Sequence, residues 1–563
     1  MTIVILMSSL VSGCGNVTDT NDMTVFRYNE VDGVSSLDPI YAVNLSNINA
    51  CNHIYNGLVM FDTNMNIMPC VAKRWEVSDD GCTYTFHLRD DVFFHTSAIF
   101  GEDSTRKVTA GDFVYSLNRI VDAENASPGS WVLANVQRNG DNLDITAVDD
   151  TTLRITLSKS YAPFLSILTM KYCSVVPKEV VEFYGKEYRK HPIGTGPFRF
   201  KFWQEDEKLV LTKNQNYFEK DSTGRRYPYL DAVAISFIKD KQTAFLEFVQ
   251  NKFDYISGIE PAYMKEFITS DGTLNPKYGD QFYLLTEPYF NTEYIGFNVE
   301  DTTSPFSDSV VRVAVNYAID KEKMLRHLRS NIGTPGVNGF IPKGLKGHGN
   351  TVRYSYNPLK AKELIQKSRF YDNGRFPEVK IATTIEYADL CNYLQNRLNF
   401  IGIPAKVDIY SAAVMKDMRS SMKLQCFRGS WVADYPDAEN YLSLFYSRNF
   451  APAGPNYFHW QDDRFDNMYE QSLATTDEQQ RHELYKAMDS LVMTKPPFIV
   501  LYYDRVLRFV NKRVSGFYSN PVNLVDLKQC KISKDINPEP AEFAFLQKNN
   551  TFAKKLKHKG NAL

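Results

Sequence analysis

The order of apolar and polar residues along the chain predicts several β-strands. In CTYTFHL, residues 82–88, apolar and polar side chains alternate, which is the period of a half-buried strand. NLDITAVDDTTLRITLS, residues 142–158, alternates twice around Asp149 and Asp150. This second pattern predicts a β-hairpin, and FIVLYYDRVLRFV, residues 498–510, predicts a further strand.

Helical periodicity appears between these strands. Residues 307–325 repeat apolar side chains every three to four positions behind Ser307 or Asp308, either of which is a good N-cap. Asn357 followed by Pro358 predicts the start of another helix, because proline at the first helical position loses no hydrogen bond.

A third helix is predicted from a Thr476/Gln479 capping box, with a stop at Pro496 and Pro497. Its expected apolar face consists of Leu484, Ala487, Met488, Leu491 and Val492. Because strands and helices alternate through much of the chain, the pattern favours mixed α/β units over a sandwich or a helical bundle.

Length and charge narrow the class of protein. The 563 residues are too many for one hydrophobic core, so two or three structural units are expected. Hydrophobic residues make up 43% of the chain and charged residues 23%, as in an ordinary globular protein. The net charge of −2, without a long basic stretch, argues against nucleic acid as a partner.

The first residues look like an export signal. TIVILMSSLVSGCG is a short apolar run that ends in small residues before Cys14, and it is too short to cross a bilayer. VSGC resembles the lipobox of bacterial lipoproteins, in which the cysteine is lipidated, although the usual Lys or Arg before the apolar run is missing. We expect a signal over residues 1–14 and a linker over 15–23; a buried first strand is the alternative.

No arrangement of residues indicates catalysis. The chain lacks a GxxxxGK[ST] phosphate loop and a GxSxG elbow, and HELYK from His482 lacks the second histidine of a zinc protease motif. Of 8 cysteines, seven remain after Cys14, with no CxxC and no zinc spacing, so most are expected to be buried apolar residues. The sequence therefore favours binding over catalysis, without a metal or cofactor.

Asp434 is the residue whose chemistry most needs an explanation. In SWVADYP it lies between Trp431 and Tyr435, and a carboxylate sheltered by aromatic rings is costly unless it meets a cation or several donors. A ligand ammonium group would meet that need. The alternative is that Asp434 accepts backbone N–H groups in its turn while Asp437 caps the next helix.

Seven stretches together resemble the solute-binding proteins of peptide and nickel ABC importers, family 5, and among them the oligopeptide-binding members most. The resemblance runs from about residue 24 to residue 533. It is carried by SLDPIYAVNLSNINACNHIYNGLVMFD (36–62), PCVAKRWEVSDDGCTYTFHLRDDVFFH (69–95), VTAGDFVYSLNRI (108–120), PIGTGPFRFKFW (192–203), NQNYF (214–218), SPFSDSVVRVAVNYAIDKEKM (304–324) and GSWVADYPDAENYL (429–442).

The resemblance implies an α/β fold of two lobes, joined by two hinge strands and closing around a ligand, with an extra subdomain in the first lobe. The implied boundaries are 24–62, 174–287 and 498–533 for the first lobe, 63–173 for the extra subdomain, 288–497 for the second lobe and 534–563 for a tail.

It also implies a peptide site. Asp434 matches the aspartate that holds a ligand's α-amino group, and Arg428 matches an arginine that can pair with a peptide carboxylate. The peptide main chain is expected to add as a β-strand between the lobes. The implied ligand-binding residues are Val43, Asn44, Leu45, Arg428, Ser430, Trp431, Val432, Ala433, Asp434 and Tyr435.

The expected function is therefore that of a monomeric, lipid-anchored receptor rather than an enzyme. It would sit in the periplasm or on the outer face of the cytoplasmic membrane, capture short peptides and deliver them to an ABC permease with its ATPase subunits. Three alternatives stay open: the same fold with another solute, such as a nickel chelate, haem or an oligosaccharide; an exported peptide hydrolase or chaperone; and a cell-surface adhesion or sensing role without transport.

Overall fold

The structure is a computed structural model that describes residues 23–258 and 261–533. The expected signal with Cys14, all but the last residue of the expected linker, and the expected tail 534–563 lie outside the described residues. Within the described ranges, no helix is both long enough and apolar enough to span a bilayer.

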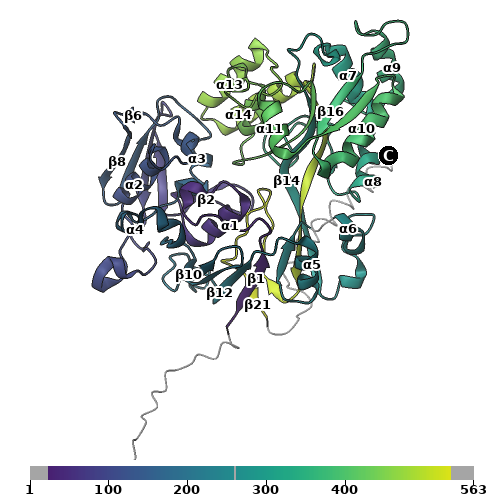
Figure 1. The fold of residues 1–563 in the computed structure, drawn as a ribbon. Helices are drawn as coiled ribbons and strands as arrows, with labels where there is room; N and C mark the ends of the chain where they lie inside the picture. The colour runs from purple at the N-terminus through teal and green to yellow at the C-terminus, as the bar shows by residue number, and fades with distance from the viewer. Residues whose placement is uncertain (1–22, 259–260, 534–563) are drawn as a thin grey trace, which may run out of the picture.

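One large sheet runs through the molecule (Figure 1). Its strands follow the order β10-β11-β12-β1-β13-β19-β14-β18-β16-β17, and β15 pairs with β19. The bounds are β1 (Val25–Asn29), β10 (Phe198–Gln204), β11 (Lys208–Lys213), β12 (Ala232–Ser236), β13 (Tyr255–Ser257), β14 (Phe282–Phe297), β15 (Thr334–Pro335), β16 (Val379–Thr383), β17 (Ala405–Ile409), β18 (Cys426–Val432) and β19 (Phe498–Asn511).

Strands β14 and β19 connect the two halves of the molecule. They pair antiparallel from Phe282 opposite Asn511 to Gly296 opposite Phe498, with a register shift between Pro288 and Thr292. On one side of that shift β19 also pairs with β13, and on the other β14 also pairs with β18. The strand predicted over residues 498–510 is confirmed as β19.

A second, separate sheet is antiparallel and lies within residues 63–173, the segment predicted to form the extra subdomain. Its strands are, in order, β4 (Ala72–Val77), β5 (Thr83–Leu88), β9 (Thr152–Thr156) and β8 (Ile145–Asp149). Tyr84, Phe86 and Leu88 of β5 are buried, as alternation predicts, and the hairpin around Asp149 and Asp150 is confirmed. Helix α2 (Ala110–Val121) packs against β8 and β9 over an apolar core of its own.

The predicted caps of two helices are confirmed. The Asp308 side chain accepts from the N–H of Val310 at the start of α7 (Ser309–Ala318), and Asn357 caps α9 (Pro358–Gln366). The Thr476/Gln479 capping box is wrong by one residue, because Asp477 caps α14 (Glu478–Val492). A carboxylate at that position also interacts favourably with the positive end of the helix dipole.

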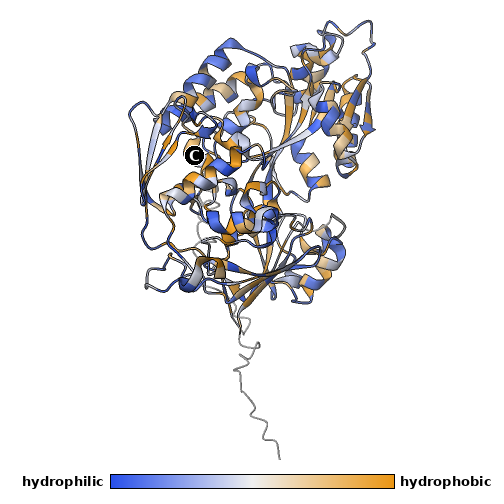
Figure 2. Ribbon diagram, turned by 60° about the vertical axis from the view of Figure 1, so that its left-hand side comes forward, coloured by the Kyte–Doolittle hydropathy of each residue, from blue (hydrophilic) through white to orange (hydrophobic). Residues whose placement is uncertain are grey.

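The remaining helices and short strands cover the sheets, and Figure 2 shows polar and hydrophobic residues alternating along many of the helices. Six of the seven described cysteines are buried and all are unpaired, as expected of small apolar residues. The bounds are α1 (Leu45–Ile54), α3 (Phe164–Ile167), α4 (Lys178–Tyr184), α5 (Lys241–Val249), α6 (Pro261–Phe267), α8 (Lys321–Leu328), α10 (Ala388–Phe400), α11 (Ala412–Ser420), α12 (Glu439–Leu442), α13 (Asp463–Ala474), β2 (Val59–Phe61), β3 (Ile67–Pro69), β6 (Arg138–Asn139), β7 (Asn142–Leu143), β20 (Val514–Ser515) and β21 (Lys531–Ile532).

Candidate functional site

Strand β18 leaves part of one edge open. On one side it pairs with β14 along its whole length, from Phe297 opposite Cys426 to Asn291 opposite Val432. On its other side it meets β16 at one position, Ala382 opposite Phe427, and no described strand pairs with residues 429–432 on that side. An open strand edge can add an extended peptide through main-chain hydrogen bonds. Two of the predicted contact residues, Ser430 and Val432, lie on this edge.

Asp434 follows directly after β18 and is exposed to solvent. Its carboxylate accepts one hydrogen bond from the described residues, from the side-chain amide of Asn440 at 3.3 Å. Asn440 also holds the turn, because its Oδ1 accepts from Trp431 Nε1 at 2.9 Å and from the N–H of Asp434 at 3.3 Å. Within the described ranges no backbone N–H donates to the Asp434 carboxylate, so the turn itself does not satisfy this charge.

The surroundings of Asp434 favour its protonated form although the side chain is accessible. Partial desolvation by the surrounding protein raises the pKa of Asp434, and the Asn440 hydrogen bond offsets only part of that shift. Burial raises the pKa values of Tyr172, from the extra subdomain, and of Tyr441, and the nearby charge of Asp434 raises both further. No cation among the described residues forms an ion pair with Asp434, so an incoming ammonium group would stabilise the carboxylate.

The side chain of Tyr435 contacts other protein residues, whereas the sequence suggests that it faces Asp434 and a ligand. The sequence places it beside the ligand as a shelter for Asp434, but its side chain is buried and its hydroxyl donates to Glu439. Its ring lies 6.5 Å from the ring of Trp131, which belongs to the extra subdomain. Tyr435 therefore joins two parts of the molecule, and its contact with a ligand stays a prediction.

Glu439 is the centre of that contact. Its buried carboxylate accepts from the hydroxyls of Tyr435, Tyr469 and, at 3.4 Å, Tyr161. Burial raises the pKa of Glu439, and these tyrosine hydrogen bonds lower it. Because Tyr161 comes from the extra subdomain, this cluster ties the subdomain to the half that contains β18. The backbone hydrogen bond from Ala162 N to Leu473 O, at 2.8 Å, does the same.

Arg428 is already paired inside the protein. Its guanidinium forms an ion pair with Glu293 of β14, and it lies over the ring of Tyr387 at 3.2 Å from the ring centroid. Glu293 is 2% exposed, and burial raises its pKa in spite of the arginine. Contact between Arg428 and a peptide carboxylate stays a prediction.

The predicted contacts of the first lobe lie at the start of α1. Val43 and Leu45 are exposed apolar residues, and the side chain of Asn44 caps the helix by accepting from the N–H of Asn47 at 2.8 Å. Ala433, on the opposite side of the predicted site, is buried and donates its N–H to Phe290 O at 3.0 Å. In the described part of the chain no hydrogen bond joins residues 43–45 to residues 430–433.

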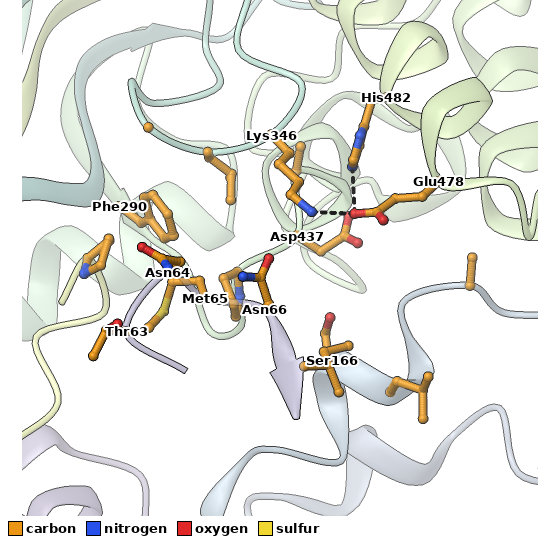
Figure 3. Close-up of a pocket in the computed structure, with 18 of the residues that line it drawn as sticks. Thr63, Asn64, Met65, Asn66, Ser166, Phe290, Lys346, Asp437, Glu478 and His482 are labelled. Atoms are coloured by element: carbon orange, nitrogen blue, oxygen red, sulfur yellow. Dashed lines mark hydrogen bonds and ion pairs between the residues drawn. The ribbon is translucent and has the colours of Figure 1, made fainter. Parts of the chain in front are cut away.

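A cavity of about 1160 Å³ is lined by Pro436, Asp437 and Ala438, the residues that directly follow Asp434 and Tyr435, among others. Figure 3 shows Met65 and Asn66 facing Lys346, Glu478 and His482 across it. Several charged groups on its wall are paired with one another: Lys346 and His482 with Glu478, and Arg481 with Asp437 at 3.4 Å.

Sequence reasoning did not find this cavity, because its lining comes from segments that are far apart in the chain and share no motif. The same reasoning missed the Glu293–Arg428 pair. A signal for that pair existed, since the acidic Glu293 directly precedes the apolar run YIGF, residues 294–297. No group of three His, Cys, Asp or Glu side chains in residues 23–258 and 261–533 is placed to hold a metal ion.

Two halves joined by two long strands are the architecture of a binding protein that can enclose a solute, and the open strand edge with Asp434 beside it offers the solute a contact surface. The sequence model of bacterial extracellular solute-binding proteins, family 5, middle part, matches residues 66–452. The chain therefore belongs to this family of binding proteins. The expected family and the expected two-lobed α/β fold are both confirmed.

Characterised relatives cover most of the chain. It is 27% identical over 486 residues to a dipeptide-binding protein of Escherichia coli, covering 83% of this chain and 87% of the relative. It is 29% identical over 485 residues to heme-binding protein A of Haemophilus influenzae, covering 83% and 85%. These relatives are binding proteins, which agrees with the prediction that the chain is not an enzyme.

Solved structures show the same fold. The periplasmic binding protein DppA from Helicobacter pylori, in complex with the peptide STSA, superposes with a TM-score of 0.73 at 25% identity, over 91% of this chain and 98% of that one. HbpA2 from Haemophilus parasuis superposes with a TM-score of 0.79 at 25% identity, over 90% and 100%.

Proposed function

We propose that this protein captures short peptides outside the cytoplasmic membrane and delivers them to an ABC permease and its ATPase subunits. It would act as a monomer, held at the membrane by a lipid on Cys14. The dipeptide-binding relative and the peptide complex of the Helicobacter pylori protein support the ligand class. Membership of an extracellular solute-binding family supports the location.

One observation in the structure carries the proposal: Asp434 has no cationic partner in the described chain and lies at the end of the open edge of β18. An extended peptide that pairs with residues 430–433 has a route to this carboxylate for its terminal ammonium. The strand edge gives affinity that does not depend on side chains, and the carboxylate selects for a free amine.

Binding between the lobes would favour the closed state. Moving the lobes from 1:99 to 99:1 closed takes about 5.5 kcal/mol of differential affinity. Main-chain hydrogen bonds with one charge-assisted contact are of that order, since a hydrogen bond to a charged group contributes about 1.5–3 kcal/mol. Strands β14 and β19, which cross from one half to the other, are the segments that would bend.

The ligand class is tested by isothermal titration calorimetry of the purified, unfolded-and-refolded protein with the tetrapeptide Ser-Thr-Ser-Ala. Refolding removes any peptide carried over from the cells. We expect saturable 1:1 binding, and native mass spectrometry of the protein before refolding should show masses of short peptides. If neither this peptide nor a pool of random di- to pentapeptides binds, the proposal is wrong.

Haem is the second candidate ligand, because the relative of 29% identity is named a heme-binding protein. Titration with haem, followed by the Soret absorbance, distinguishes the two. A peptide receptor should show no saturable haem spectrum and no loss of peptide binding in the presence of haem. Saturable haem binding by a protein that fails to bind peptide would favour haem.

The lipid anchor is tested by metabolic labelling with a palmitate analogue. The full-length chain should take up the label and fractionate with membranes, and Cys14→Ala should abolish both. Cys51→Ala is the matched control, because Cys51 is buried in the folded protein and lies outside the expected signal.

A further inference from the structure

Glu293 faces the same side of the sheet as the residues predicted to hold the peptide. In an antiparallel pair, directly opposite residues share a face, and Glu293 lies opposite Ser430. Arg428 is two residues along β18 from Ser430, so it shares that face as well. The acid and the arginine are therefore diagonal neighbours on the surface that the resemblance assigns to ligand binding.

The ion pair between Glu293 and Arg428 is buried in the protein rather than exposed at its surface. Glu293 Oε2 accepts from Arg428, and its Oε1 accepts from the side-chain amide of Asn291 at 3.0 Å. The side chains of Glu293 and Arg428 are 3% and 12% exposed, and the guanidinium also lies over the ring of Tyr387. Neither charge is therefore free to turn toward a ligand without breaking a buried contact.

A second pair lies next to the first. Arg329 forms an ion pair with Asp504 at 2.9 Å and lies over the ring of Tyr502, which is opposite Glu293 across β14 and β19. The charges of Arg329 and Glu293 act on one another. The charges of the two arginines and the two acids in this cluster therefore sum to zero. By contrast, no cation in residues 23–258 and 261–533 forms an ion pair with Asp434.

We propose that Glu293 is a specificity-determining residue: by holding Arg428 it removes the cation that would meet a ligand carboxylate, so this protein binds peptides without reading their C-terminal carboxylate. The inference rests on the proposed function of peptide binding. It deepens that function by naming the ligand class, namely peptides recognised through a free amine and the main chain, whether their C-terminus is free, amidated or extended by further residues.

The test compares Ser-Thr-Ser-Ala with its C-terminal amide by calorimetry. The wild-type protein should bind both with dissociation constants within about twofold of each other. Glu293→Gln keeps the shape of the side chain but can accept from only one of the two donors, Arg428 and Asn291. It frees the charge of Arg428, so it should bind the free acid at least about tenfold more tightly than the amide. The Glu293→Gln/Arg428→Gln double variant, which removes both charges, should return to equal binding.

The outcomes separate this inference from the proposed function. Wild-type protein that binds the acid at least tenfold more tightly than the amide overturns the inference while peptide binding stands. A Glu293→Gln variant without acid preference, at an unchanged melting temperature, also overturns it. If neither peptide binds the wild-type protein, peptide binding itself is contradicted, and the inference falls with it. Asp417→Asn, an exposed acid on α11, is the control for a change in net charge.

If Glu293→Gln fails to fold, the double variant carries the test alone. Its acid and amide affinities should both match those of the wild-type protein within about threefold, because the wild-type pair contributes no net charge to the ligand. A tenfold loss of acid binding in the double variant, with amide binding kept, would show that Arg428 does contact the carboxylate and would overturn the inference.

Discussion

Asp434 and Glu439 are two carboxylates five residues apart, and the structure treats them in opposite ways. Glu439 is buried and accepts from the hydroxyls of three tyrosines. Asp434 is exposed and accepts one hydrogen bond of 3.3 Å from Asn440. Glu439, whose hydrogen bonds all come from the protein itself, stabilises the structure. Asp434, which accepts a single long hydrogen bond from the described residues, is available to a ligand.

Glu439 and Asp434 also differ in the parts of the molecule that they connect. Glu439 connects the half that contains β18 to the extra subdomain through Tyr161. Asp434 makes no such connection through a hydrogen bond or an ion pair in the described residues. A substitution at Glu439 should therefore change stability, and a substitution at Asp434 should change binding.

Glu439→Ala should have the largest effect of those considered. It leaves three buried tyrosine hydroxyls without their acceptor, and each unsatisfied buried group costs about 1–3 kcal/mol. Some of these hydroxyls can bond to one another, so we expect a loss of about 3 kcal/mol in the free energy of unfolding, measured by urea denaturation. Asp434→Ala is the matched control and should change that free energy by less than about 0.5 kcal/mol. Equal losses in the two variants would contradict the comparison.

Asp434→Asn should weaken binding of peptides with a free amine by about 10- to 100-fold. The amide keeps the size of the side chain but loses the charge, and a hydrogen bond to a charged group contributes about 1.5–3 kcal/mol. Calorimetry with Ser-Thr-Ser-Ala measures the loss, and Asp417→Asn should leave affinity unchanged. Wild-type affinity in Asp434→Asn would show that the carboxylate does not hold the ligand.

Much of the fold follows from local patterns in the sequence. The alternation in residues 82–88, the hairpin at Asp149 and Asp150, and the cap at Asn357 all depend on neighbouring residues, so they can be predicted from the sequence. The position of Asp434 next to β18 also follows from local sequence. Confirmation of the two-lobed fold came from similarity to known proteins, because periodicity does not show how strands from distant segments join one sheet.

The roles of Tyr435 and Arg428 could not be predicted from the residues around them. Tyr435 meets Tyr161, which is 274 residues away in the chain, and Arg428 meets Glu293, which is 135 residues away. In both cases the polar group has a partner from a distant segment, which the neighbouring sequence does not reveal. Long-range pairing therefore decides whether a polar residue near a site is available to a ligand.

Affinity for peptides with a free amine should fall several-fold as the pH drops from 7 toward the raised pKa of Asp434. A protonated carboxyl cannot pair with an ammonium group, so the contribution is present above that pKa and lost below it. The nearby Tyr172 and Tyr441 stay neutral through this range, since their pKa values are raised. Asp434→Asn should lose this part of the pH dependence in calorimetry at pH 7, 6 and 5. An unchanged pH profile in the variant would assign the dependence to another group.

The raised pKa of Asp434 also predicts whether Asp434→Asn raises or lowers the stability of the ligand-free protein. The folded protein binds a proton at Asp434 more readily than the unfolded chain does, so the charged carboxylate costs stability above its folded pKa. Asp434→Asn should therefore be slightly more stable than the wild-type protein at pH 7, with the difference disappearing at acidic pH. A loss of stability at pH 7 would show that the carboxylate has a structural partner.

Tyr161→Phe should have a much smaller effect on stability than Glu439→Ala. It removes one hydroxyl that is 3.4 Å from Glu439 Oε2, while Tyr435 and Tyr469 continue to donate to the carboxylate. We expect a loss of about 0.5–1 kcal/mol in the free energy of unfolding, the usual contribution of one hydrogen bond. A loss as large as that of Glu439→Ala would mean that the contact to the subdomain, rather than the tyrosine cluster as a whole, carries the stability.

The central claim is that Asp434 recognises the free amine of a peptide. Calorimetry of the wild-type protein with Ser-Thr-Ser-Ala and with its N-acetylated form tests this claim most directly. The account predicts that acetylation weakens binding at least tenfold in the wild-type protein and has little effect in Asp434→Asn. Equal affinity of the wild-type protein for the two peptides would contradict it.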